Sequence, residues 1–278
     1  MVLLDIFKND KDVLVAHFNH GTRKSADDDE AFVKRRCEEL GLPISIGHSK
    51  LGPNISEEKA REARYDFLFS LRDSIQKKVP NDSVMIFTAH HLDDLIESIS
   101  INILRGTAWR GLTPFSRPGI FRPFLNDDLL MPESKADILT YAAHRKITFR
   151  EDPTNTSEKY FRNRIRAKIK TLDPEEHFLL NQKIKALYFS QRSIRAEVEE
   201  ILHSLIPEDG IFKREWFFDL EDNIAIEILR FAFAQKDVKL TNPTLADFLF
   251  AIRNFEPEKK FNLPEDRLVT IHKNYFKI

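Results

Sequence analysis

The chain has 278 residues, of which 42% are hydrophobic and 31% charged, and its formal net charge at pH 7 is −1. This composition is typical of a globular protein with one ordinary domain and a smaller one, and it excludes a chain that attracts nucleic acid over its whole surface. The single cysteine, Cys37, excludes a disulfide framework and any two-cysteine metal or redox centre. Because the sequence has no long apolar stretch and no signal peptide, we expect a cytoplasmic protein without a membrane partner.

The first 170 residues alternate between predicted helices and strands. The predicted elements are a helix at 1–8, a strand at 13–18, a helix at 25–40 that ends at Gly41, a strand at 43–48, a long helix from 56, a strand at 84–88, a helix at 92–104, an extended segment at 119–125 and a helix at 134–144. This β-α alternation predicts an α/β fold with a doubly wound parallel sheet. No glycine precedes Gly21, whereas a nucleotide-binding α/β domain normally has a glycine-rich phosphate loop after its first strand. Either the protein binds no phosphate there, or that strand and loop are missing from the chain.

The remainder of the chain has a different character, and we place a domain boundary near residue 175. Residues 176–209 are strongly charged and predict a helical linker, either one long helix or a helical hairpin. Residues 210–278 predict a small α+β domain with helices at 215–233 and 242–255. The alternating segment 259–278 then predicts a strand hairpin that turns at Pro264-Glu265-Asp266.

The most informative cluster follows the strand at 84–88, where parallel sheets bind their ligands. His90, Asp94 and Glu97 are spaced by four and three residues and so share one face of the next helix, beside His91 and Asp93. Burying these groups together is unfavourable unless a ligand or cation compensates them, so we expect an active site here. A solvated helix start capped by Asp93 or Asp94 is the plain alternative, and a metal site ranks below substrate binding.

Three further segments carry candidate ligand contacts. The turn that contains His17, Asn19 and His20 suits contacts to a nucleotide edge, or is only a polar loop. Arg64 lies among apolar neighbours on its helix, where an anionic ligand would offset an otherwise costly charge, whereas Arg61 is expected to pair with nearby glutamates. Arg105 and Gly106 predict a helix end that also contacts a phosphate.

A basic segment at 160–170 is the strongest local charge feature. On a helix, residues 162, 166 and 170 form one stripe, and residues 164 and 168 form another. Such a face is either solvated or the place where a polyanion lies; Arg162, Arg164 and Arg166 are the candidate contacts.

Six motifs in this order resemble those of the bacterial tRNA(Ile)-lysidine synthetases. The motifs are His17-Phe-Asn-His-Gly-Thr-Arg23, Ala60-Arg-Glu-Ala-Arg-Tyr65, Ala89-His-His-Leu-Asp-Asp-Leu-Ile-Glu-Ser98, Leu104-Arg-Gly-Thr107, Phe121-Arg-Pro123, and Glu151-Asp-Pro-Thr-Asn155 followed by Arg162-Asn-Arg-Ile-Arg166. The resemblance covers about the first 170 residues through motifs and continues more loosely to the end.

The resemblance implies an adenine nucleotide alpha hydrolase-like fold and a ligase that forms a carbon–nitrogen bond. Family members use ATP and Mg²⁺ to adenylate the wobble cytidine of an isoleucine tRNA with a CAU anticodon, and free L-lysine then displaces AMP to give lysidine. By position, Asp94 and Glu97 resemble carboxylates that meet the lysine ammonium groups, and Arg64 and His90 resemble residues that serve the phosphates. Arg166 resembles a tRNA contact, and the family resemblance also allows a homodimer; no residue is assigned to a metal.

One departure from the family concerns the start of the chain. The loop Ser-Gly-Gly-x-Asp-Ser and the strand before it would stand immediately ahead of Met1. We therefore expect the chain as written to be truncated and inactive, because pyrophosphate would lack the loop amides that hold it. In-frame codons for this strand and loop upstream of Met1 test this expectation. The alternatives are a tRNA-thiolating enzyme of the same superfamily, against which the single cysteine argues, and a non-catalytic tRNA-binding remnant.

Overall fold

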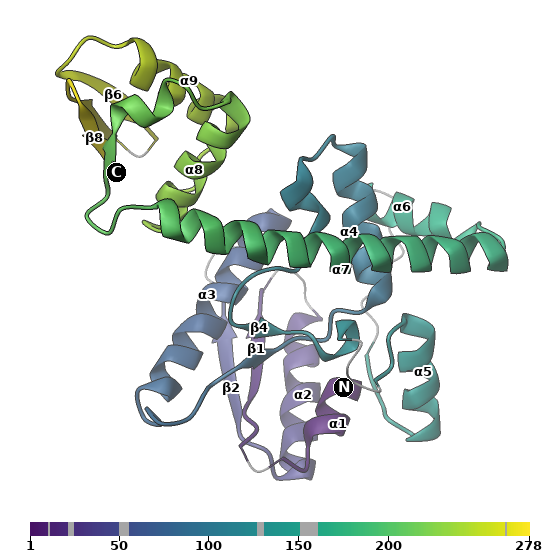
Figure 1. Ribbon diagram of the computed structural model, residues 1–278. Helices are drawn as coiled ribbons and strands as arrows, with labels where there is room; N and C mark the ends of the chain where they lie inside the picture. The colour runs from purple at the N-terminus through teal and green to yellow at the C-terminus, as the bar shows by residue number, and fades with distance from the viewer. Residues whose placement is uncertain (11, 22–24, 50–55, 127–130, 151–160, 265) are drawn as a thin grey trace. The chain divides into compact units, whose positions relative to one another are not determined.

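The computed structural model describes residues 1–10, 12–21, 25–49, 56–126, 131–150, 161–264 and 266–278 (Figure 1). The chain forms two compact units, Met1–Tyr188 and Phe189–Ile278. Among the described residues, no helix has the length and apolar character needed to cross a bilayer.

The first unit is an α/β unit with parallel strands joined by helices, which confirms the predicted fold class. Its elements are α1 (Val2–Phe7), β1 (Val15–Asn19), α2 (Ala26–Leu40), β2 (Ile44–His48), α3 (Glu57–Gln76), β3 (Ile86–Phe87), α4 (Leu92–Leu104), a 3-10 turn η1 (Trp109–Leu112), β4 (Ile120–Phe121), a 3-10 turn η2 (Pro123–Leu125), α5 (Lys135–His144), α6 (Phe161–Lys170) and the start of α7 (Pro174–Leu205). Within the described ranges, β1 pairs in parallel with β2, and β3 pairs in parallel with β4.

Local signals fix most helix ends where the sequence predicts them. The Ser56 hydroxyl accepts a hydrogen bond from the Lys59 amide at the start of α3, and Ser134 caps α5 in the same way. Gly41 ends α2 with φ of +65°, a left-handed conformation that glycine adopts without a steric penalty. By contrast, β3 and β4 are only two residues long, shorter than the predicted 84–88 and 119–125. The 3-10 turn η2, which begins directly after Arg122, limits β4.

The second unit comprises the end of α7 and a small α+β assembly. Its elements are β5 (Ile211–Lys213), a 3-10 turn η4 (Arg214–Phe217), α8 (Asp222–Ala234), α9 (Asn242–Asn254), β6 (Lys259–Leu263), β7 (Arg267–Ile271) and β8 (Tyr275–Lys277). The four strands form an antiparallel sheet in the order β5-β8-β7-β6. The hairpin between β6 and β7 pairs Leu263 with Arg267, and Glu265 at its predicted turn lies outside the described residues.

The prediction of one helix over 215–233 is wrong, because that segment is divided into η4 and α8. Arg253 of α9 explains the break: its guanidinium donates to the carbonyl oxygens of Phe217 at 2.7 Å and Leu220 at 2.6 Å, and it pairs with Asp222 at the start of α8. Carbonyls used in this way do not accept the next bonds of a continuous helix. These bonds come from a helix about thirty residues further along the chain, so no local pattern reveals them.

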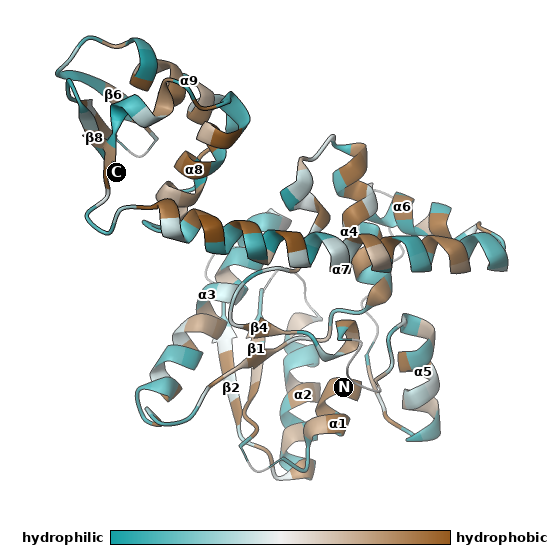
Figure 2. Ribbon diagram, viewed as in Figure 1, coloured by the Kyte–Doolittle hydropathy of each residue, from teal (hydrophilic) through white to brown (hydrophobic). Residues whose placement is uncertain are grey.

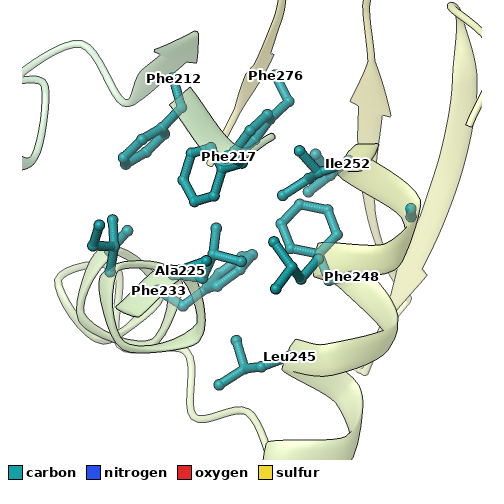
Figure 3. Close-up of a cluster of buried hydrophobic side chains, with 14 of the residues drawn as sticks. Phe212, Phe217, Ala225, Phe233, Leu245, Phe248, Ile252 and Phe276 are labelled. Atoms are coloured by element: carbon teal, nitrogen blue, oxygen red, sulfur yellow. The ribbon is translucent and has the colours of Figure 1, made fainter. Parts of the chain in front are cut away.

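Aromatic side chains fill the core of the second unit (Figure 3). The Phe276 ring is fully buried and contacts the rings of Phe212, Phe217 and Phe248, with centroids 5.4 to 5.6 Å apart. Figure 2 shows α8 to be rich in hydrophobic residues, drawn in brown, and Ala225, Ile228, Leu229, Ala232 and Phe233 are its buried members. This core belongs to the second unit alone, as expected for a separately packed domain.

Candidate active site at the amino end of α4

The turn from β3 into α4 places four polar side chains close together. His91 is the N-cap residue of α4, and its backbone amide donates to the Asp94 carboxylate at 3.2 Å. The carboxylate of Asp93 accepts a 2.8 Å hydrogen bond from the Lys135 amide at the start of α5. The aspartates thus support the helix start, as the plain alternative expects. Asp94 does so from the N3 position and Asp93 through its bond to the start of α5, whereas the cap residue itself is His91.

Glu97 lies one turn further along α4 and is 4% exposed. Arg166 forms a two-pronged ion pair with it, from Nε at 2.5 Å and Nη2 at 3.0 Å, and Arg162 Nε donates to the same carboxylate at 3.0 Å. Arg162 also lies 3.9 Å from Asp94. The sequence predicts a ligand cation beside Glu97; in the structure two arginines of α6 occupy this place, which satisfies the need of a buried carboxylate for compensation.

A pocket of about 250 Å³ opens beside these groups. Its lining residues are His91, Asp93, Asp94, Ile96, Glu97, Lys135, Arg166, Ile169, Lys170 and His177. Carboxylates and cations both contribute to the wall, so the pocket suits a small ligand that carries charges of both signs.

His90 and His91 are neighbours in sequence but have opposite electrostatic surroundings. Burial lowers the pKa of His90 to about 3, and the charges of Arg122 and Arg64 add to this effect. Burial acts in the same sense on His91, but the carboxylates of Asp93 and its neighbours outweigh it and raise the pKa of His91 above 6.5. His90 is therefore uncharged at neutral pH, and the pair of histidines divides the site into a cationic side and an anionic side.

The His90 ring is held in a defined orientation. Its Nδ1 is hydrogen-bonded to the Thr88 hydroxyl at 3.0 Å, and its ring packs on Phe115 with centroids 4.6 Å apart. Because Nδ1 is engaged, Nε2 is the nitrogen left for a ligand.

Arginines gather around the Tyr65 ring on the cationic side. The guanidinium carbons of Arg117, Arg64 and Arg61 lie 4.3, 5.4 and 5.7 Å from the ring centre. The sequence predicts that Arg61 pairs with nearby glutamates. Glu58, whose side chain the structure describes, does not form this pair. Burial alone would raise the pKa of the Tyr65 hydroxyl, but the charges of Arg61 and Arg64 lower it.

The Asn19 side chain is turned toward α2. Its amide nitrogen donates to Asp27 and Glu30, both at 2.9 Å, while its oxygen accepts from the Gly21 amide at 2.9 Å. The hydrogen bond from Asn19, with others from Lys34 and His48, lowers the pKa of Glu30 to about 2. Since all three bonds are internal, they give Asn19 a structural role in joining β1 to α2.

The two histidines of the β1 turn occupy different surroundings. His17 is half-buried, and burial lowers its pKa. His20 packs edge-on against Phe18 and lies within electrostatic range of Arg64, which together with burial lowers its pKa. The buried Nδ1 of His20 has no hydrogen-bond partner in the described segments, which makes His20 a better candidate for ligand contact than His17.

Arg105 and Gly106 lie at the opposite end of α4 from His90. The helix has 13 residues, which corresponds to a length of about 20 Å. Gly106 has φ of +70°, and its amide donates to the Ile103 carbonyl, so it ends the helix. The structure therefore brings His90, Arg64, Asp94 and Glu97 together, but not this pair.

Helix α6 carries the predicted tRNA contacts on two different faces. Arg162 and Arg166 face Glu97, whereas Arg164 is exposed. The motif Glu151-Asp-Pro-Thr-Asn155 and Arg23 of the β1 turn lie outside the described residues.

The sequence prediction missed Arg122 and Arg117 as candidate ligand residues. Phe121-Arg122-Pro123 is among the family motifs, so a signal for Arg122 existed, but its role depends on which side chains surround it. Within the described ranges, no group of three or more histidine, cysteine, aspartate or glutamate side chains is arranged to hold a metal ion.

The sequence and the fold were compared with those of known proteins. Residues 1–172 match the PP-loop domain family. The tRNA(Ile)-lysidine synthase of Petrotoga mobilis is 32% identical over 238 residues, covering 80% of this chain and 70% of that protein. The enzyme of the same name from Staphylococcus epidermidis is 26% identical over 276 residues, and this chain spans 61% of its length.

One solved structure shows the same fold. The U34-tRNA thiolase of Methanococcus maripaludis superposes with a TM-score of 0.51 at 17% identity, covering 69% of this chain and 66% of the thiolase chain. The predicted nucleotide-hydrolase-like architecture is thereby confirmed at the level of the fold.

Proposed function

Because the chain belongs to the tRNA(Ile)-lysidine synthase family of PP-loop proteins, we propose that it attaches lysine to the wobble cytidine of an isoleucine tRNA at the expense of ATP. In the first step the C2 oxygen of the cytidine attacks the α-phosphorus of ATP, and pyrophosphate leaves. In the second step an amino group of lysine attacks C2, and AMP leaves with the original oxygen atom.

The division of the site by two adjacent histidines is the observation that best supports this proposal. His91 lies beside carboxylates suited to a diamino acid, and His90 lies beside arginines suited to phosphate. A reaction that joins a cationic amino acid to a phosphate-activated base needs both environments at one place. We assign Asp94 and Glu97 to the lysine ammonium groups, and Arg64 and His90 to the phosphates.

The assignment of Glu97 to lysine requires that the arginines of α6 move away from the carboxylate or compete with lysine for it. A lysine ammonium group that binds Glu97 must share or displace the guanidinium groups of Arg162 and Arg166, which already occupy both carboxylate oxygens. We propose that tRNA phosphates draw these arginines from Glu97, so that the tRNA and lysine sites become competent together.

ATP use follows from the PP-loop family, and Mg²⁺ is proposed as the counter-ion of ATP. The described side chains do not form a metal-binding group, so we assign no protein ligand to it. Mg²⁺ often keeps several waters and is held largely by substrate phosphates, which agrees with this arrangement.

The test is AMP release from ATP with lysine and an isoleucine tRNA transcript carrying a CAU anticodon. It is run on the chain as written and on a chain extended by the upstream codons of its gene. We expect release to require both lysine and the wobble cytidine, so a transcript with uridine at that position is the matched control. Release that continues without lysine would contradict the proposal, and tRNA binding without release in either chain would support the non-catalytic remnant.

Thiolation is the less favoured alternative. The thiolase likeness is limited to the fold, and Cys37, the single cysteine of this sequence, is completely buried in the first unit. Sulfur transfer normally needs an accessible thiolate. Transfer of labelled sulfur to the transcript would overturn this ranking.

The cellular location and the oligomeric state are part of the proposal. We place the protein in the cytoplasm and propose a homodimer. Light scattering on the purified chain tests the second point, and a monomer mass across the working concentration range would contradict it.

A further inference from the structure

Four arginine side chains converge on the cationic side of the site. They are Arg61, Arg64, Arg117 and Arg122. Among the described residues, no ion pair involves any of them. Contacts with aromatic rings offset a cation by roughly 0.5 to 2 kcal/mol, which is little against the mutual repulsion of several charges. Within the described part of the chain, the cluster therefore lacks the negative charge that would balance it.

Arg122 is the buried member of the cluster. It is 8% exposed, its Nη1 donates to the Ile120 carbonyl at 3.2 Å, and its guanidinium carbon lies 5.4 Å from the centre of the Phe115 ring. Among the residues that the structure describes, its buried Nε has no hydrogen-bond partner. Burial lowers the pKa of this guanidinium, which means that the position disfavours the charge that the residue carries. A buried donor without a partner on a buried cation indicates a missing ligand.

The topology places Arg122 where a ligand is expected. Strands β3 and β4 pair in parallel, with Phe87 opposite Phe121, and the Thr88 amide donates to the Phe121 carbonyl. Arg122 is the residue directly after β4, and His90 lies three residues after the end of β3. Both side chains therefore extend from the carboxyl ends of adjacent parallel strands, the edge at which such sheets bind ligands.

We propose that Arg122 is a phosphate-binding residue that, with Arg64 and Arg117, holds a phosphate ester of the substrate at the carboxyl edge of the β3–β4 pair. This inference rests on the proposed function in one respect, namely the identity of the substrate that carries the phosphate. A guanidinium with several donors suits phosphate oxygens, and the uncharged His90 beside it leaves Nε2 available for a further hydrogen bond. The phosphate belongs either to the nucleotide or to the RNA backbone.

The experiment measures binding of two probes, ATP and an RNA anticodon stem-loop, to the full chain by equilibrium dialysis. Arg122→Met removes the charge but keeps much of the side-chain volume, and we expect ATP binding to weaken about ten-fold or more. Arg122→Lys should recover part of this loss because it restores a cation without the fork of donors. Weaker binding of the stem-loop instead of ATP would assign the phosphate to the RNA.

Two further variants keep the test decisive if Arg122→Met does not fold. Arg117→Gln removes a half-buried member of the cluster, and we expect a several-fold loss for the same probe. Arg72→Gln is the matched control, because Arg72 also lies over an aromatic ring of α3 but is neutralised by Asp73 at 2.6 Å. We expect no change in binding from it.

Unchanged binding of both probes by folded Arg122→Met and Arg117→Gln overturns the proposal, as does a wild-type chain that binds neither probe.

A second readout is independent of any reaction. Because Arg122 contributes to the low pKa of His90, Arg122→Met should shift the His90 imidazole titration upward in an NMR pH series. Phosphate binding by a chain whose extended form also shows no lysine-dependent AMP release would leave this inference intact and contradict the proposed function.

Discussion

At the scale of single residues, His90 carries a prediction about pH. Its pKa in the folded chain, about 3, lies below the ordinary value of 6.5, so between these values the unfolded chain binds the proton more readily. The free energy of unfolding should therefore fall as the pH drops from 6.5, by at most about 1.4 kcal/mol per pH unit from this residue.

The variant His90→Gln tests this expectation by urea unfolding between pH 6.5 and 5, above the range in which most carboxylates titrate. We expect a flatter dependence of unfolding free energy on pH in the variant than in the wild type. The exposed His144 provides the control His144→Gln. Parallel pH dependences for wild type and His90→Gln would contradict a depressed pKa at this position.

Glu97 carries the second prediction at this scale. In Glu97→Gln the guanidinium groups of Arg162 and Arg166 face a neutral amide, and we expect a loss of about 1 to 3 kcal/mol in unfolding free energy. The arginines are partly exposed and can turn to water, which keeps the loss below that of a fully buried pair. Urea unfolding measures it. Equilibrium dialysis with labelled lysine on the same variant should show weaker binding.

The control for Glu97→Gln is Glu199→Gln on α7. Glu199 pairs with Arg195 at 2.8 Å on a partly exposed surface, so its loss should cost less than about 1 kcal/mol. Equal effects of the two variants would mean that burial of Glu97 adds nothing to the strength of its ion pairs.

At the scale of elements, α6 has two faces with different expected roles. One face holds α4 through Arg162 and Arg166, while Arg164 and Lys168 are exposed. The double variant Arg164→Gln with Lys168→Gln should weaken tRNA binding and reduce its dependence on salt by up to about two ion equivalents.

Filter binding at several salt concentrations measures this effect, and Arg162→Gln with Arg166→Gln is the comparison. The comparison variant, which removes the pairing with Glu97, should in addition loosen α6, seen as faster amide exchange over residues 161–170. An unchanged tRNA affinity and salt slope in the exposed-face variant would identify that face as merely solvated.

At the scale of the whole molecule, the two units have separate cores. Phe248 is completely buried in the core of the second unit (Figure 3). Phe248→Ala should lower the stability of that unit by about 3 to 5 kcal/mol, because truncation of a buried ring leaves a cavity.

Calorimetry should then show the transition of the second unit moving to a lower temperature while that of the first unit stays in place. The exposed ring of Phe250 supplies the control Phe250→Ala. A single transition that shifts as a whole would show that the units unfold together.

The sequence by itself determined the order of the elements, the α/β class and the strand end that carries the polar cluster. Helix caps, alternation of apolar residues and turn chemistry act over a few residues, so α2, α3, α4 and α5 begin and end where local signals place them. The same locality explains the failure over 215–233, where Arg253 of a later helix interrupts the predicted one.

Only the tertiary structure decided which charges meet. Glu97 pairs with Arg162 and Arg166 from a helix far along the chain, Arg122 comes to His90 through the pairing of β3 with β4, and Asn19 turns inward to α2. Each of these outcomes depends on distances of a few ångströms between elements separated in sequence, because Coulomb energy and hydrogen bonding fall steeply with separation. A local pattern identifies the groups capable of chemistry, whereas packing selects the partner that each one receives.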